Sequence, residues 1–171
     1  MEFVLKNCMR HAQYAFPESM VTYDVSFPEP IREDRVRLIC HGEPVAHQFS
    51  EKQLTDGKLC GAKLSFITDL PEHSEKHFFL EAGTPRAGTA IAHWEGDVLV
   101  LQNDYLALRI AACGDPLFAI CQADVKGFAR LGEPCQKRVE LLENGAVFAR
   151  VRVTAAFPDG SSYVQQLTVN A

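Results

Sequence analysis

The sequence DVLVLQNDYLALRI, from Asp97 to Ile110, predicts a tight β-hairpin. Two apolar runs meet at positions 102–104, where Gln, Asn and Asp tolerate turn geometry. In the second arm Leu106, Leu108 and Ile110 alternate with smaller or polar residues. This period of two places one face of a strand on a core and the other towards water.

A second hairpin is predicted for positions 147–169, with its turn at the sequence Pro-Asp-Gly-Ser of positions 158–161. Val147, Ala149, Val151 and Val153 share one face of its first strand. We find no apolar stripe of helical spacing and length anywhere in the chain. The chain is therefore predicted to be almost entirely β.

The N-terminal half continues the strand pattern, with proline and glycine marking the turns. The segment ending at Phe27 alternates, and Pro28 and Pro30 are expected to end it because proline lacks a backbone donor. Asp56-Gly57 predicts a hairpin turn. Beyond that turn Cys60, Ala62, Leu64 and Phe66 are the predicted buried set. Further strands are expected at 3–5, 35–40, 45–49, 76–81 and 117–123, and an irregular loop or a turn of helix at 126–138.

The stretch from Ala82 to Ala92, AGTPRAGTAIA, is rich in Gly, Pro, Thr and Ala and predicts a linker. We expect a small β-barrel over residues 1–88 and an antiparallel β-sandwich, or the first sheet of a supersandwich, over residues 93–171. The second module has few strands for a sandwich, so we expect the polypeptide to end in mid-domain. An exposed edge strand is then expected to pair, for example in a homodimer.

Composition and charge exclude several classes of function. The chain has 171 residues, 47% of them hydrophobic and 23% charged, with a net charge of −5, which is typical of a globular protein. Without a basic face, the chain is not expected to bind nucleic acid. No apolar run approaches the roughly 20 residues of a membrane span. Six scattered cysteines without a CxxC pair, and no signal peptide, favour reduced thiols and a cytoplasmic location, and indicate no metal or cofactor.

A family resemblance rests on the sequences of the predicted strands and turns between positions 18 and 169. The order VTYDVSFPEP, RVRLI, the Asp56-Gly57 turn, KLSFITDLP and FFLEAG resembles the N-terminal RIFT-type β-barrel of exo-acting rhamnogalacturonan lyase-like polysaccharide lyases. The opening strands of the β-sandwich that follows this barrel in the family are similar to two later segments, LQNDYLALRI and ENGAVFARVRVTAAFPDGSSYVQQLTV. Comparable strands open the supersandwich domains of α-mannosidases and related glycoside hydrolases. One departure is the absence of the family's tryptophan near Asp56-Gly57, where Leu54, Lys58 and Leu59 stand.

The resemblance implies a non-catalytic N-terminal scaffold of a carbohydrate-active enzyme, because such enzymes carry their chemistry in a downstream α/α-toroid domain that has no counterpart here. The expected partner is a glycan or that catalytic domain. The alternative is a self-standing carbohydrate-binding or protein-interaction module. We identify no catalytic residue. Arg109, Arg150 and Arg152 with Tyr105 and Tyr163 are the side chains a uronate lyase could use, but solvated surface charges explain the arginines more simply.

His93 and Trp94 are the candidate carbohydrate-binding residues. Trp94 is the one tryptophan of the chain, and an indole face stacks on a sugar ring while a neighbouring imidazole forms a hydrogen bond. The alternative is a tryptophan that seals the contact between barrel and sandwich. His73 and His77 are four apart, but outside a helix they would not share the face a zinc pair uses. The remaining candidates have simpler explanations: Asp97 and Asp104 as solvated turn residues, and His41 and His47 as surface residues.

Overall fold

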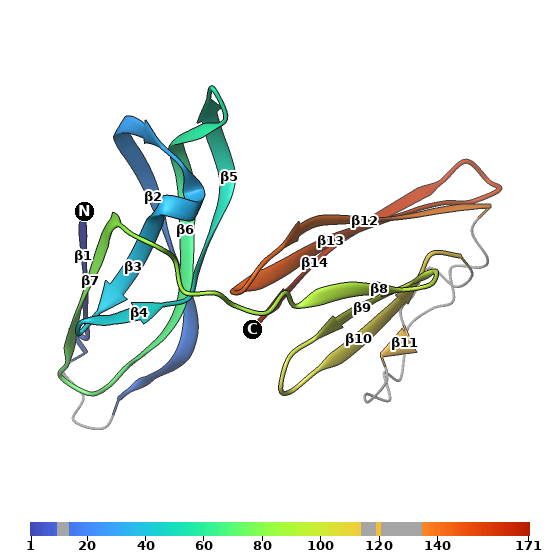
Figure 1. Cartoon of the computed structure of the whole chain (residues 1–171). Helices are drawn as coiled ribbons and strands as arrows, with labels where there is room; N and C mark the ends of the chain where they lie inside the picture. The colour runs from blue at the N-terminus through green and yellow to red at the C-terminus, as the bar shows by residue number, and fades with distance from the viewer. Residues whose placement is uncertain (10–13, 114–118, 121–134) are drawn as a thin grey trace. The chain divides into compact units, whose positions relative to one another are not determined.

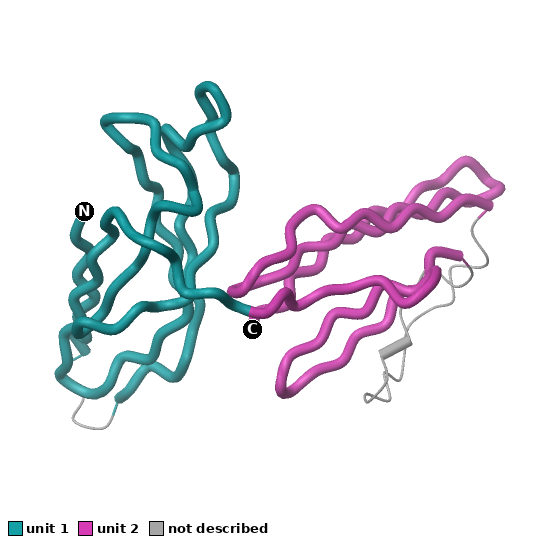
Figure 2. The backbone as a smooth tube through the Cα atoms, in the orientation of Figure 1, with its two compact units in different colours: residues 1–88 teal, residues 89–171 magenta. Residues whose placement is uncertain are grey.

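The computed structural model describes residues 1–9, 14–113, 119–120 and 135–171, and these residues form an antiparallel β protein. The all-β prediction is confirmed, since one short 3₁₀ turn, η1 (Glu33–Arg35), accompanies the strands in the described part of the chain. The chain divides into two compact units, Met1–Gly88 and Thr89–Ala171 (Figures 1 and 2). Over the same described ranges, the structure has no helix with the length and apolarity that crossing a bilayer requires.

The strands have the following bounds. Unit 1 contains β1 (Glu2–Lys6), β2 (Phe16–Ile31), β3 (Val36–Cys40), β4 (Glu43–Val45), β5 (His47–Thr55), β6 (Lys58–Leu70) and β7 (Glu75–Ala82). Unit 2 contains β8 (Ala92–Glu95), β9 (Val98–Gln102), β10 (Ala107–Ala111), β11 (Ala119–Ile120), β12 (Gln136–Asn144), β13 (Phe148–Ala156) and β14 (Ser162–Asn170). The segment between β7 and β8 coincides with the predicted linker, and the division into units falls inside it.

Unit 1 is built from two sheets with strand orders β1-β7-β3-β4 and β2-β6-β5. Their inner faces share one core, in which Phe66 of β6 lies with its ring centroid 4.6 Å from that of Phe78 of β7. Leu38 and Leu64, one from each sheet, are fully buried in the same core. The closed barrel stays a prediction, because the described pairing forms two sheets.

Strand β2 differs from the sequence expectation at its C-terminal end. It continues through Pro28 and Pro30 to Ile31 instead of ending at Phe27. The pairing with β6 shifts register between Ser26 and Ile31, so the prolines lie where the ladder is interrupted. β2 is also an edge strand, so on its open side there is no neighbouring strand that would need the backbone donor that proline lacks.

The buried set of β6 is correct from Ala62 onward and wrong before it. Ala62, Leu64 and Phe66 are buried, but Leu59 is fully buried in place of Cys60. The ladder to β5 shifts register here, because Leu54 pairs with Leu59 while Gln53 pairs with Gly61. This β-bulge leaves Cys60 as the extra residue and reverses the alternation. The Cys60 thiol instead donates to the Gln53 carbonyl at 3.2 Å.

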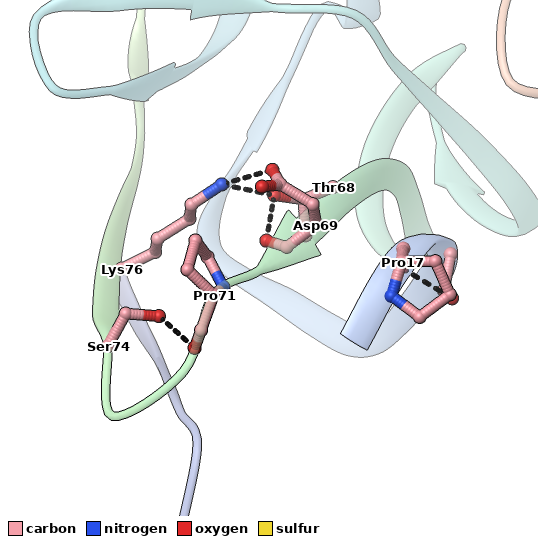
Figure 3. Close-up of polar contacts among 7 residues, drawn as sticks. Pro17, Thr68, Asp69, Pro71, Ser74 and Lys76 are labelled. Carbon is pink, nitrogen blue, oxygen red and sulfur yellow. Dashed lines mark hydrogen bonds and ion pairs between the residues drawn. The ribbon is translucent and has the colours of Figure 1, made fainter. Parts of the chain in front are cut away.

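The turn between β6 and β7 is held by side chains at both of its ends (Figure 3). Lys76 pairs with the Asp69 carboxylate and donates to the Thr68 hydroxyl at 3.3 Å, while the Ser74 hydroxyl donates to the Pro71 carbonyl at 2.7 Å. The hydrogen bond from Lys76 is the main reason that the pKa of Asp69 is lowered. These contacts fix the turn that brings β7 back beside β1 and β3.

Unit 2 contains both predicted hairpins. β9 pairs with β10 in the sheet β11-β10-β9-β8, and β13 pairs with β14 in the sheet β12-β13-β14. Leu99 and Leu101 of the first sheet and Ala149, Val151 and Val153 of the second are completely buried in one core. The expected strand at 117–123 falls in the described chain only as β11, and most of the expected loop at 126–138 lies outside the described residues.

Asn144, the last residue of β12, links the two sheets of unit 2 through its side-chain amide, which forms the two hydrogen bonds that a neighbouring strand would form with Ala92 of β8. Its side-chain oxygen accepts a hydrogen bond from the Ala92 amide at 2.9 Å, and its side-chain nitrogen donates to the Ala92 carbonyl at 2.7 Å. Ala92 itself is buried, so both of its backbone groups depend on this amide.

Replacing Asn144 with Ala should therefore lower the free energy of unfolding by about 1–3 kcal/mol, because it leaves a buried donor and a buried acceptor without partners. Urea titration followed by circular dichroism measures this loss. Asn103→Ala is not a suitable control, because Asn103 bonds backbone groups of its own turn and the Asn170 carbonyl. Exposed Gln136, at the other end of β12, offers a better one as Gln136→Ala. Equal stability of Asn144→Ala and Gln136→Ala would contradict the assignment.

Candidate functional site

The two predicted sugar-binding residues lie on β8, a short strand at the edge of the sheet β11-β10-β9-β8. His93 pairs with Val100 and Trp94 pairs with Leu99. Successive side chains of a strand point to opposite faces, and residues paired across strands share a face. His93 and Trp94 therefore lie on opposite faces of β8, and the imidazole does not lie beside the indole on one face as the sequence suggested.

His93 belongs to a small cluster of charged side chains on the outer face. Its Nε2 lies 3.1 Å from Glu95 Oε1, and Arg109 Nη2 of β10 lies 2.7 Å from Glu95 Oε2. Arg109 is the main cause that lowers the pKa of Glu95, and His93 adds to it. All three side chains are about half exposed, at 42–55%. The cluster can exchange hydrogen bonds with a polar ligand, but its one carboxylate is already engaged by the Arg109 guanidinium and the His93 ring.

Trp94 lies on the face that carries the core of unit 2, in one row with Leu99 and, through it, with Ile110. Leu99 and Ile110 are buried, whereas Trp94 remains 45% exposed because β8 is the edge of its sheet. Part of the indole is therefore accessible for stacking. Tyr105, in the β9–β10 turn, is 88% exposed, more than any other large aromatic side chain among the described residues.

The arginines considered for a uronate lyase are paired with acids or exposed. Arg109 binds Glu95, and Arg150 Nη1 lies 3.3 Å from Glu143 Oε1. The Arg150 guanidinium also lies over the Phe148 ring, 5.1 Å from its centroid. Arg152 is exposed on the same face of β13. A lyase needs a cation that neutralises the substrate carboxylate beside a base. Arg109 and Arg150 are already neutralised by the protein's own acids.

Apart from His93, the histidines in the described part of the chain are dispersed over turns and strands of unit 1. His41 and His73 occupy turns with positive φ, at 52° and 49°. His47 of β5 is half-buried, with Nδ1 3.3 Å from the Val45 carbonyl, so the expectation of a surface residue is wrong for it. His77 of β7 lies between Glu2 and Glu75, with each ring nitrogen 2.8 Å from a carboxylate oxygen. Within the described ranges, no three His, Cys, Asp or Glu side chains are grouped as metal ligands.

His77 and His47 should make the free energy of unfolding depend on pH in opposite directions. Hydrogen bonds to Glu2 and then Glu75 raise the pKa of His77, so its contribution is present below about pH 6.5 and is lost as the pH rises through the raised value. Burial lowers the pKa of His47, so its contribution is present above about pH 6.5 and is lost as the pH falls through the lowered value.

Urea midpoints measured between about pH 5.5 and pH 8 should therefore pass through a maximum near the middle of this range. His77→Gln should flatten the alkaline limb, and His47→Gln should flatten the acid limb. A profile in which His77→Gln leaves the alkaline limb unchanged would contradict the role of its two carboxylate partners.

A shallow polar groove lies on the outer face of the sheet β2-β6-β5 and was not anticipated from the sequence. Its volume is about 240 Å³, and its lining is Asp24, Val25, Ser26, Glu51, Gln53, Gly61, Ala62 and Lys63. Lys63 Nζ lies 2.8 Å from a Glu51 oxygen. No aromatic residue lines the groove. The alternation of polar residues in β2 was the available signal, but the register shift between β5 and β6 beside Gln53 and Gly61 of the lining is not visible in the sequence.

Comparisons with known proteins give weak structural similarity and no sequence family. No protein-family model matches the chain, and no curated protein matches it. A protein of glycosyl hydrolase family 38 from Enterococcus faecalis is similar in structure over 90% of this chain, at 15% identity and a TM-score of 0.44. An α-mannosidase from Enterococcus faecalis V583 also covers 90% of this chain, at 11% identity and a TM-score of 0.38. The chain spans about a quarter of each of these proteins, 24% and 23%.

Proposed function

We propose that this chain is a non-catalytic β region of a carbohydrate-active enzyme. It would support a separate catalytic domain, and that domain would cleave rhamnogalacturonan or a related uronate-containing glycan. The observation that carries the proposal is the succession of two antiparallel β units in which Arg109, Arg150 and His77 are paired with the protein's own acids, and the described candidates do not converge on one site.

The charged clusters support a structural role for these side chains. Glu95 engages His93 and Arg109, and Glu143 engages Arg150. A glycosidase needs two carboxyl groups about 5–10 Å apart on either side of the scissile bond, one of them with a raised pKa. The pKa of Glu95 is lowered. This carboxylate is suited to binding cations and unsuited to donating a proton to a leaving group.

The sequences of the strands and turns support the choice of family. The sequences that resemble a RIFT-type barrel and the opening of the following sandwich fall in unit 1 and unit 2 respectively, in the same order. In that family the catalytic domain is a different part of the polypeptide. The same placement is proposed here, with the two β units supporting that domain.

A direct assay tests the non-catalytic role. The purified 171-residue chain, incubated with rhamnogalacturonan, should release no unsaturated uronate and no new reducing ends. Any turnover that survives heating controls and repeated purification, and that disappears in Arg109→Ala, would overturn the proposal in favour of an independent enzyme.

The alternative function is a self-standing carbohydrate-binding module, and the 45% exposure of Trp94 favours it. Aromatic stacking on a sugar changes the environment of the indole, and Trp94 is the one tryptophan of the chain. Titration with rhamnogalacturonan oligosaccharides followed by tryptophan fluorescence is expected to show no saturable change under the scaffold proposal. A saturable change that Trp94→Phe abolishes in a parallel calorimetric titration, and Tyr105→Ala preserves, would favour the binding module instead.

A further inference from the structure

The edge strands of this protein differ in how far they are protected from pairing with another strand. An unpaired edge is a template for association, and proteins block it with charges, proline, bulges or short length. β2 carries prolines and two register shifts, β5 carries two register shifts, and β4 has three residues including Pro44. β1 carries Glu2 and Lys6, and the four-residue β8 is covered at Ala92 by Asn144.

The sheet β12-β13-β14 has one protected and one unprotected edge. β12 contains four charged residues, Lys137, Arg138, Glu140 and Glu143, and a register shift beside Glu143. β14, with the sequence SYVQQLTVN, contains no Asp, Glu, Lys, Arg or Pro over nine residues, and its register with β13 is unbroken. Among the edges formed by the described strands, β14 alone has no charge, proline, register shift or short length to protect it, and Asn103 covers only its last residue, Asn170.

The direction of the backbone groups of β14 follows from the end of its ladder. The Ala171 amide donates to the Val147 carbonyl of the neighbouring chain segment at 2.8 Å, so the groups of Asn170 point the other way. The Asn170 carbonyl indeed accepts from the Asn103 side chain at 2.9 Å. Since the direction alternates along an antiparallel strand, the amide and carbonyl groups of Val164, Gln166 and Thr168 point outward, where the described strands supply no partner.

We propose that β14 pairs with β14 of a second copy of this chain, antiparallel and about a twofold axis at Gln166. In this register Gln166 faces Gln166 of the other copy, and Val164 faces Thr168. All of these residues have outward-pointing backbone groups, so they form hydrogen-bonded pairs. The result is one continuous sheet across the two copies, to which each copy contributes β12, β13 and β14.

The side chains of β14 favour a second copy over an unrelated strand. Val164 is 59% exposed, and pairing with Thr168 would cover it with a residue that packs well in sheets. The two Gln166 amides can exchange hydrogen bonds across the axis. The protein's net charge of −5 opposes close approach of two copies, and a neutral edge is the surface at which that repulsion is smallest. Because one strand pair is a small interface, the association should be weak and dependent on concentration.

Sedimentation equilibrium of the whole chain over a range of concentrations tests the proposal, with charge variants at the axis. Gln166→Lys and Gln166→Glu each place like charges opposite one another and should raise the dimer dissociation constant roughly fivefold or more. An equimolar mixture of the two variants should restore association, because Lys then faces Glu. Gln136→Lys, the matched change at the protected edge, should leave the dissociation constant unchanged.

Three results would overturn the proposal: a monomer at all concentrations, a dimer that both Gln166 variants leave intact, or a mixture that fails to restore association when circular dichroism shows both variants folded. These outcomes are independent of the function proposed above, because a monomeric chain can still be the β region of an enzyme, and a dimer can equally be formed by a binding module.

Discussion

Phe66→Ala should lower the free energy of unfolding by about 3–5 kcal/mol, the range for removing a fully buried phenylalanine. The ring of Phe66 is completely buried and connects the two sheets of unit 1, with centroids 4.6 Å from Phe78 and 6.2 Å from Tyr23. Removing it leaves a cavity at the place where the two sheets meet. Since domains of this size are stable by only about 5–15 kcal/mol, the loss is a large part of the total.

Urea unfolding followed by far-ultraviolet circular dichroism measures this effect. The matched control is Phe79→Ala, the neighbouring phenylalanine of β7, whose side chain is 42% exposed on the other face. The control should lose far less than Phe66→Ala. Equal losses for the two variants would mean that the core of unit 1 is not centred on Phe66.

Leu99→Ala should lower the free energy of unfolding by about 2–5 kcal/mol in unit 2. Leu99 is completely buried in the core between the two sheets, and it is the strand partner of both Trp94 and Ile110. The cavity therefore lies beside the indole of Trp94. The emission of Trp94 should shift towards that of an indole in water already in the folded variant.

Tryptophan fluorescence during urea unfolding reads both effects at once, because Trp94 is the one tryptophan and belongs to unit 2. Leu106→Ala serves as the control, since Leu106 is 38% exposed in the β9–β10 turn region. A Leu99→Ala variant with wild-type emission and a midpoint equal to that of Leu106→Ala would contradict the described packing of β8 on β9.

Much of the fold follows from local patterns in the sequence. The hairpin of β9 and β10 and that of β13 and β14 have unbroken registers and polar turns, and the alternation in β10 and β13 agrees with the turn chemistry. The linker was also predictable, since its composition differs from that of the strands on both sides. Leu59 and Cys60 could not be assigned correctly, because a bulge depends on the register of two strands and not on the sequence of one.

The candidate site was harder to predict than the fold. Trp94 was singled out as the one tryptophan, and its partial exposure agrees with an accessible aromatic residue. His93 and Trp94 do not share a face, because residues 92–95 form a strand that the sequence did not suggest, and a strand separates neighbours onto opposite faces. The role of Asn144 depends on a contact with Ala92, 52 positions away, which no local pattern reveals.

The most direct test compares the native protein with the isolated chain. Native material is purified from source cells with an antibody against residues 1–88, and its cleavage of rhamnogalacturonan is measured beside that of the recombinant 171-residue chain. The account predicts cleavage by the native material, carried by a polypeptide or complex larger than 19.0 kDa, and none by the recombinant chain. Native material that contains only a 19.0 kDa chain and cleaves no glycan, or a recombinant chain that cleaves by itself, would contradict it.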